Sequence, residues 1–195
     1  MDNVVTQKEE RIFRGGIFLL FGKVLVEIPT SSLVLPSPSQ KHILYEGSPF
    51  STLSDSSKGF LFEYLAMEVW RMKFGRICLP TYHKGEPKRM YDFHYETNQR
   101  KIEVKSSSLI CNKVTWQFQF KHVKLRNFDN LILVCYFPKK VEMYLWDGQT
   151  GFINRKPNVA ESEGHSIVIS AKISDSGFMV RKEPGIKFFD RYFYN

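Results

Sequence analysis

The chain has 195 residues, of which 43% are hydrophobic and 15% aromatic, and its formal net charge at pH 7 is +8. This apolar content excludes a disordered chain, and the length is that of one domain with a sizeable core. The positive charge favours an acidic partner, with nucleic acid ahead of an anionic membrane.

The N-terminal part is predicted to be an elaboration, residues 1–56, on a single domain. Its longest apolar stretch, residues 17–28, is too short and too charged to span a bilayer, so we expect no membrane partner. The acidic start and the missing cleavage site also argue against a signal peptide. Residues 29–58 contain four prolines and read as a surface excursion or a linker.

The three cysteines, Cys78, Cys111 and Cys135, are far apart in the chain and odd in number. Such spacing suits neither a disulfide framework nor a zinc site. We therefore expect buried thiols in a protein of the reducing cytoplasm.

Residues 58–74 are predicted to form a buried helix, because apolar side chains occur almost all round the helical wheel. Ser56 or Ser57 can cap its N-terminus. Two acids, Glu63 and Glu68, interrupt the apolar surface. A buried carboxylate is costly without a partner, so at least one of them is a candidate for a site.

Two segments with alternating side-chain types, residues 89–96 and 101–107, predict a β-hairpin. Its second strand carries apolar residues on one face and charged residues on the other. Further strands are expected over residues 115–120, 131–137, 141–146 and 166–173, with a short basic helix over 121–127. The continuous apolar run at 131–137 is typical of a strand buried on both faces. The resulting fold class is α/β or α+β.

Three charged residues of the hairpin, Asp92, Glu103 and Lys105, form the candidate site. Neighbouring strands lie about 5 Å apart, and residues two apart share a face. Two carboxylates can hold a hard divalent cation, which polarises a phosphoryl oxygen and lowers the pKa of a bound water. The lysine can orient that water or stabilise developing negative charge. The alternative is a pair of unlike charges on a solvated hairpin.

This arrangement resembles the PD-(D/E)XK nuclease superfamily, which has the restriction-endonuclease-like fold. Asp92 matches the motif Asp, and Glu103, Val104 and Lys105 match its E-x-K. Glu63 matches an acid that the preceding helix often contributes, and Glu68 competes for that role. Tyr91 stands where the family often has proline.

The resemblance implies a core of order α-β-β-β-α-β over residues 57–147, with a central mixed sheet flanked by helices. It also implies Mg²⁺ as cofactor, held by Asp92, Glu103 and the backbone carbonyl of Val104. Gln117 would lie next to the active site. The expected activity is sequence-specific cleavage of double-stranded DNA that leaves a 5′-phosphate. A small chain of this kind suits a type II restriction enzyme, which usually acts as a homodimer.

DNA contacts are expected from two basic clusters that flank the hairpin, residues 71–89 and 112–128, and from residues 148–195 as a recognition elaboration. The residues predicted to contact DNA are Lys88, Arg89, Ser107, Gln119, Lys121, Lys124, Gln149, Asn154, Arg155 and Lys156. The tail from residue 181 mixes basic and aromatic residues, which suits nucleic acid or a strand packed on the core.

Three further functions stay open at this point. A homing endonuclease or a junction-resolving nuclease of the same fold would have the same motif. A non-catalytic nucleic-acid-binding module would have the same charge, with the hairpin residues as ordinary surface charges.

Overall fold

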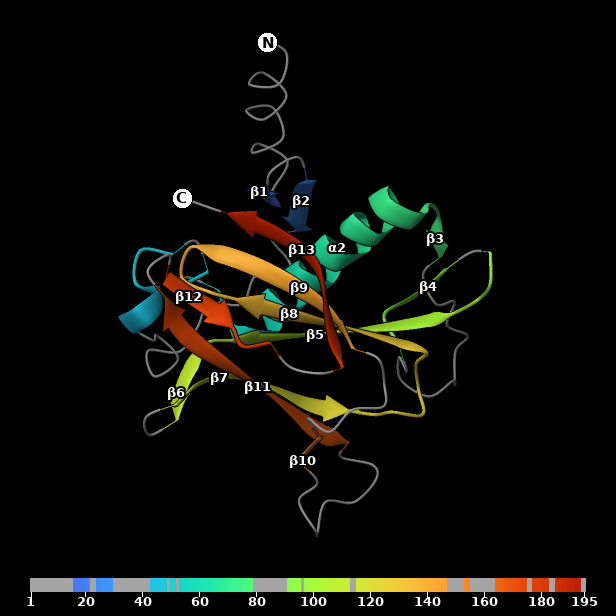
Figure 1. Ribbon diagram of the computed structural model, residues 1–195. Coiled ribbons are helices and arrows are strands. Elements are labelled where there is room, and N and C mark those ends of the chain that lie inside the picture. Colours follow the sequence, from blue (N-terminus) through green and yellow to red (C-terminus); the bar gives the residue numbers. More distant parts are fainter. Residues whose placement is uncertain are drawn as a thin grey trace.

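The computed structural model describes residues 16–21, 24–29, 43–48, 50–51, 53–78, 91–95, 97–112, 115–146, 153–154, 164–174, 177–182 and 185–193. This part contains one α-helix, α2 (Asp55–Phe74), and two larger β-sheets (Figure 1). A separate hairpin, β1 (Gly16–Phe21) with β2 (Val24–Pro29), lies against α2. The chain is thus an α+β protein with a mixed sheet, as the coarse fold class predicted.

The central sheet has the strand order β13-β9-β8-β5-β4-β3. Its strands are β3 (Ile77–Cys78), β4 (Phe93–Tyr95), β5 (Lys101–Ser108), β8 (Asn130–Tyr136), β9 (Lys140–Trp146) and β13 (Ile186–Phe193). Neighbouring strands are antiparallel except for β5 and β8, which are parallel. This one parallel pair makes the sheet mixed.

The second sheet has the order β10-β11-β7-β6, and β12 also pairs with β11. Its strands are β6 (Ile110–Asn112), β7 (Thr115–Val123), β10 (Ile153–Asn154), β11 (His165–Ser174) and β12 (Gly177–Val180). The buried Leu109 is the single residue between β5 and β6, so the chain passes directly from the first sheet into the second.

Helix α2 begins one turn earlier than expected. The prediction of Ser56 or Ser57 as N-cap is wrong, because Ser54 caps the helix and its Oγ accepts a hydrogen bond from the Ser57 N–H at 3.2 Å. Ser54 has extended φ and ψ angles, as an N-cap requires. The helix ends at Gly75, whose φ of 99° a residue with a side chain would adopt only under strain.

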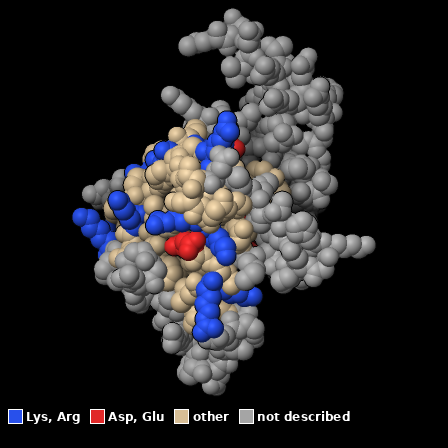
Figure 2. Space-filling view, turned by 90° about the vertical axis from the view of Figure 1, so that its right-hand side faces the viewer, with Lys and Arg blue, Asp and Glu red and all other residues tan. Residues whose placement is uncertain are grey.

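The C-terminal turn of α2 is bonded to strands near opposite edges of the central sheet. Tyr95 of β4 donates its hydroxyl to the Phe74 carbonyl, and Lys73 pairs with Asp190 of β13 at 3.1 Å. Figure 2 views the side of the molecule on which β3 and β4 lie. Lys and Arg side chains are spread over the described part of this side, around a small acidic area.

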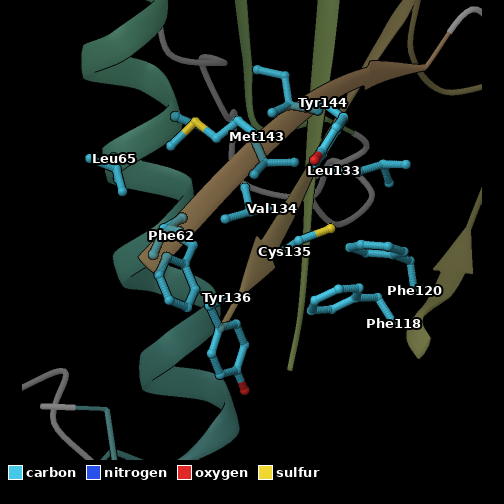
Figure 3. Packing of buried hydrophobic residues seen from close by; sticks show 14 of the residues in the cluster. Phe62, Leu65, Phe118, Phe120, Leu133, Val134, Cys135, Tyr136, Met143 and Tyr144 are labelled. Atoms are coloured by element: carbon cyan, nitrogen blue, oxygen red, sulfur yellow. The ribbon is translucent and has the colours of Figure 1, made fainter. Parts of the chain in front are cut away.

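The core has two layers, one on each face of β8 (Figure 3). On the face toward α2, Tyr136 stacks on Phe62 with ring centroids 4.9 Å apart. On the opposite face, Cys135 points toward Phe118 and Phe120 of β7. Residues 131–136 are all buried, so the prediction of a strand buried on both faces is confirmed.

The predicted helix over residues 121–127 is wrong. Lys121 to Val123 continue β7, and a turn follows, closed by the Asn127 N–H donating to the Lys124 carbonyl at 3.0 Å. Val123 pairs with His165 of β11, so strand pairing outweighs the helical propensity of this basic segment.

The expected order of the core also changes. Residues 115–120 belong to the second sheet, and the short β3 is the third strand of the antiparallel group instead. Within the described residues, α2 covers one face of the central sheet and the second sheet covers the other. The expectation of helices on both faces is therefore not met there.

The C-terminal strand β13 divides its aromatic residues between core and surface. Phe189 packs against Trp70 and Phe74 of α2, with centroids 5.8 and 6.0 Å apart. Phe188 and Phe193 are 50% and 65% exposed. Phe189 is thus the buried aromatic residue of this strand, and the half-exposed Phe188 contacts the Tyr144 ring with centroids 5.8 Å apart.

Two smaller expectations concern the thiols and the membrane. Cys135 is buried as expected, whereas Cys111 is exposed. None of the helices in the described part combines the length and the apolar character that crossing a bilayer requires.

Candidate functional site

The predicted β4–β5 hairpin is present and positions the candidate site. Phe93 pairs with Ile102, and His94 pairs with Lys101. A turn over residues 97–100 joins the strands, with Gln99 at a φ of 55°. Strand β4 is shorter than expected, so it pairs with only the first two residues of β5.

Asp92 comes immediately before β4 and lies along the edge of β5. Its N–H donates to the Ile102 carbonyl at 2.9 Å, and its carboxylate Oδ2 accepts from the Val104 N–H at 2.7 Å. A hydrogen bond to a carboxylate is roughly twice as strong as a neutral one. The Asp92 carboxylate is thereby held at the middle residue of the E-x-K sequence.

Glu103 and Lys105 share one face of β5 and form an ion pair. Their side chains are 13% and 26% exposed, so solvent reaches both. Ile102 and Val104 point to the other face and are buried in the core. The structure therefore brings Asp92, Glu103 and Lys105 together on one hairpin.

The two helix acids have different surroundings. Glu63 is half-buried and lies two turns before Trp70 on the same side of α2. The Trp70 ring packs against the Phe93 ring, with ring centroids 6.1 Å apart. Phe93 is the neighbour of Asp92. Glu68 instead pairs with Arg71 at 2.5 Å, with its side chain 33% exposed. The flank of α2 that carries Glu63 and Trp70 therefore faces the side of the sheet with Phe93 and Ile102, opposite to Glu103 and Lys105.

A cavity of about 340 Å³ opens along β5 beyond the part that β4 covers. It lies between the N-terminal turn of α2 and β7. Its polar lining includes Lys58, Lys105, Ser106, Ser107, Gln119 and Lys121. Lys105 thus belongs both to the Glu103–Lys105 ion pair and to the lining of the cavity.

Of the remaining predicted residues, some lie at this cavity and others do not. The backbone N–H of Gln119 donates to Ser107 Oγ at 2.9 Å, and both residues line the cavity. Gln117 lies opposite Ile110 and Ser170 in the second sheet. Lys124 is exposed at the end of β7. Lys88, Arg89, Gln149, Arg155 and Lys156 lie outside the described residues, and Asn154 is described only as part of the strand β10.

Sequence reasoning missed Asp55, Lys58 and Tyr136, which also line the cavity. Lys58 pairs with Asp55 at 3.2 Å, and its side chain is only 11% exposed. Burial raises the pKa of Tyr136 to about 12, partly offset by a hydrogen bond from Ser108. Only Tyr136 stood out in the sequence, as a hydroxyl inside the apolar run 131–137, whereas Asp55 and Lys58 lie in a polar stretch that gave no signal.

The donor set of the hairpin suits a hard cation. Across the described ranges, three or more His, Cys, Asp or Glu side chains nowhere gather as a metal site. The candidate set is two carboxylates and one backbone carbonyl. A strand residue directs its N–H and C=O to the same edge, so the Val104 carbonyl points toward Asp92. All of these donors are oxygens, which Mg²⁺ prefers.

Comparison with known proteins yields no relative: no protein-family model, no curated protein and no solved structure matches the chain.

Proposed function

We propose that this protein is a Mg²⁺-dependent endonuclease of double-stranded DNA with a core similar to that of the PD-(D/E)XK nucleases. The observation that carries the proposal is the bond from the Val104 N–H to the Asp92 carboxylate, beside the Glu103–Lys105 ion pair. An Asp that immediately precedes one strand and a Glu-x-Lys on the next strand are thus adjacent in space, as that motif requires.

The residues have distinct roles in the proposed reaction. Asp92, Glu103 and the Val104 carbonyl would hold Mg²⁺. A bound Mg²⁺ supplies Lewis acidity at the phosphoryl oxygen and a water of lowered pKa. Glu103 holds the Lys105 ammonium at the site, where Lys105 orients the attacking water and stabilises the developing negative charge. Glu63 is the proposed helix acid, and Gln117 stays a candidate on β7.

The order of elements supports this core. Helix α2 is followed by the antiparallel strands β3, β4 and β5, and then by β8, which is parallel to β5. The family has the same order, with a helix between the last two strands. Here the β6–β7 hairpin takes the place of that helix.

The charge distribution supports a DNA substrate. The chain has a net charge of +8, and Lys and Arg surround a small acidic area in Figure 2. Positive side chains of this kind neutralise backbone phosphates. We propose a type II restriction enzyme that acts in the cytoplasm as a homodimer, because a two-fold axis matches a palindromic site.

The test is plasmid cleavage with Mg²⁺ by the wild type, Lys105→Ala and Asp92→Asn. The amide introduced by Asp92→Asn keeps an oxygen that can accept from the Val104 N–H, so this substitution removes charge more than structure. Both variants should lose about 100-fold or more in rate. Lys172→Gln, an exposed lysine on β11, is the control and should cleave normally. Full activity of Lys105→Ala, or a wild type that cleaves no DNA, would contradict the proposal.

A second candidate is a non-catalytic nucleic-acid-binding module. The observation that favours it is that Lys105 is already paired and the Asp92 carboxylate already has a backbone donor. Such a module would bind DNA in a salt-dependent manner, and neither Mg²⁺ nor Asp92→Asn would change its affinity.

Adding a four-way junction to the cleavage assay distinguishes a junction-resolving nuclease from a restriction enzyme, which would cut only the plasmid.

A further inference from the structure

We infer that the cavity beside Lys105 binds the phosphate group of a nucleotide. The inference rests on the proposed function for the identity of the substrate, since Lys105 belongs both to the cavity and to the candidate site on the hairpin. It assigns a binding role to Ser106, Gln119 and Lys121.

The charge of the lining favours an anion. Three lysines, Lys58, Lys105 and Lys121, line the cavity beside one carboxylate, that of Asp55. Asp55 is paired with Lys58, and Glu103 is paired with Lys105. Among the described residues no acid pairs with Lys121, so one positive charge remains available to a ligand.

The hydrogen-bonding groups also match a phosphate, whose oxygens accept several bonds. Two of the three serines are occupied: Ser107 donates to the Ser108 carbonyl at 3.1 Å, and Ser108 bonds the Tyr136 hydroxyl. Within the described part of the chain, the side chains of Ser106 and Gln119 have no hydrogen-bond partner. Together with Lys121 they offer a hydroxyl, an amide and an ammonium as donors.

The size of the cavity indicates more than a bare ion. One water occupies about 30 Å³ in the liquid, and ligand pockets begin at about 300 Å³. At about 340 Å³ the cavity can take a phosphate together with its sugar or base. We therefore assign it to a nucleotide unit rather than to inorganic phosphate alone.

The position of the cavity connects it to the cleavage site. Successive strand residues rise by about 3.3 Å, so Ser106 lies about 10 Å along β5 from Glu103. Charges on one DNA strand recur every 3.4 Å or so along the duplex axis. If a DNA strand is cleaved at Asp92 and Glu103, one of its phosphates therefore reaches the cavity. That phosphate lies within a few nucleotides of the cut. A free nucleotide offers the same group.

The test is binding without metal, in EDTA, by calorimetry with three probes: inorganic phosphate, dTMP and a 5′-phosphorylated dinucleotide. We expect dTMP to bind and inorganic phosphate to compete with it. Lys121→Gln and Ser106→Ala should each weaken binding about tenfold, as the loss of one charge-assisted contact predicts. Lys121 is exposed, so its replacement should not disturb the fold. The matched control is again Lys172→Gln.

Two outcomes would overturn this inference: no binding of any probe at about 10 mM, or equal weakening by Lys121→Gln and Lys172→Gln. Tighter binding of the dinucleotide than of dTMP would identify a DNA strand as the ligand, and equal affinities a free nucleotide; both support the site. If the protein binds phosphate but cleaves no DNA, only the proposed nuclease function is contradicted. If it cleaves DNA but binds no phosphate, only the binding role of the cavity is contradicted.

Discussion

The central sheet has two clusters of acidic and basic side chains on the same face. The edge cluster consists of Asp92, Glu103 and Lys105. The interior cluster consists of Lys140, Glu142, Tyr144 and Arg191. Strand pairing relates them, since Glu103 lies opposite Leu131 of β8, and Cys135, four residues further along β8, lies opposite Glu142. Similar residue types thus occur twice on one surface, in very different surroundings.

The interior cluster is closed. Glu142 is 1% exposed, and its Oε1 accepts from Lys140 Nζ at 2.9 Å and from Arg191 Nε at 2.7 Å. Its Oε2 accepts from the Tyr144 hydroxyl at 2.7 Å. Burial and the nearby Glu142 raise the pKa of the Cys135 thiol. Both oxygens of this carboxylate are committed to protein donors, which is the pattern of a structural network.

The edge cluster is open by comparison. Glu103 is 13% exposed, and its partner Lys105 lines the cavity. The short β4 leaves most of this edge of β5 uncovered in the described part of the chain. The difference teaches that residue type alone does not identify a site here, because a substrate must be able to reach the charged groups.

The largest effect should come from breaking the interior cluster. Glu142→Gln weakens the hydrogen bonds that three donors make to a carboxylate only 1% exposed, and a hydrogen bond to a charged group is worth about 1.5–3 kcal/mol. Glu103→Gln at the edge should cost about 1 kcal/mol or less, because it breaks a single ion pair in which both side chains are open to solvent. Urea unfolding of both variants measures this, and equal losses would contradict the distinction between the clusters.

An intermediate effect should appear at alkaline pH. Burial raises the pKa of Tyr136 from 10 to about 12, so the unfolded state releases this proton first. Stability should therefore fall as the pH rises from about 10 to 12, with a contribution of about 2–3 kcal/mol from this group.

Replacing either tyrosine sharpens the comparison. Tyr136→Phe should remove its share of the alkaline loss. Burial and the hydrogen bond to Glu142 act in the same direction on Tyr144 and raise its pKa further, so Tyr144→Phe should flatten the profile more. Unfolding titrations between pH 8 and 12 test the order, and a larger change in Tyr136→Phe would refute it.

The smallest effect on stability should come from the exposed helix pair. Glu68→Gln removes an ion pair with Arg71, which is worth about 0–1 kcal/mol at the surface, and should leave DNA cleavage unchanged. Glu63→Gln should instead lower the cleavage rate while the protein stays folded. Cleavage and urea unfolding of the two variants measure this. If Glu68→Gln is the one that lowers cleavage, Glu68 is the helix acid.

Local sequence was sufficient for the elements that make the hairpin. The alternation around Glu103 depends only on the two-residue period of a strand, so the shared face with Lys105 was predictable. The apolar run at 131–137 likewise identified a strand buried on both faces. The helix was predictable in its body, whereas its start depended on Ser54, six residues before Phe60, the first apolar side chain of the helix.

The sequence by itself therefore determined the fold class, the presence of the helix and the grouping of Asp92, Glu103 and Lys105, although the last turn of the helix is exposed rather than buried. Only the tertiary structure decided that β7 leaves the central sheet, and that the cavity and the interior cluster exist. Each of these depends on pairs far apart in the chain, such as Phe120 with Ile167 and Glu142 with Arg191. Periodicity reports which way a side chain faces, but not which distant strand it meets.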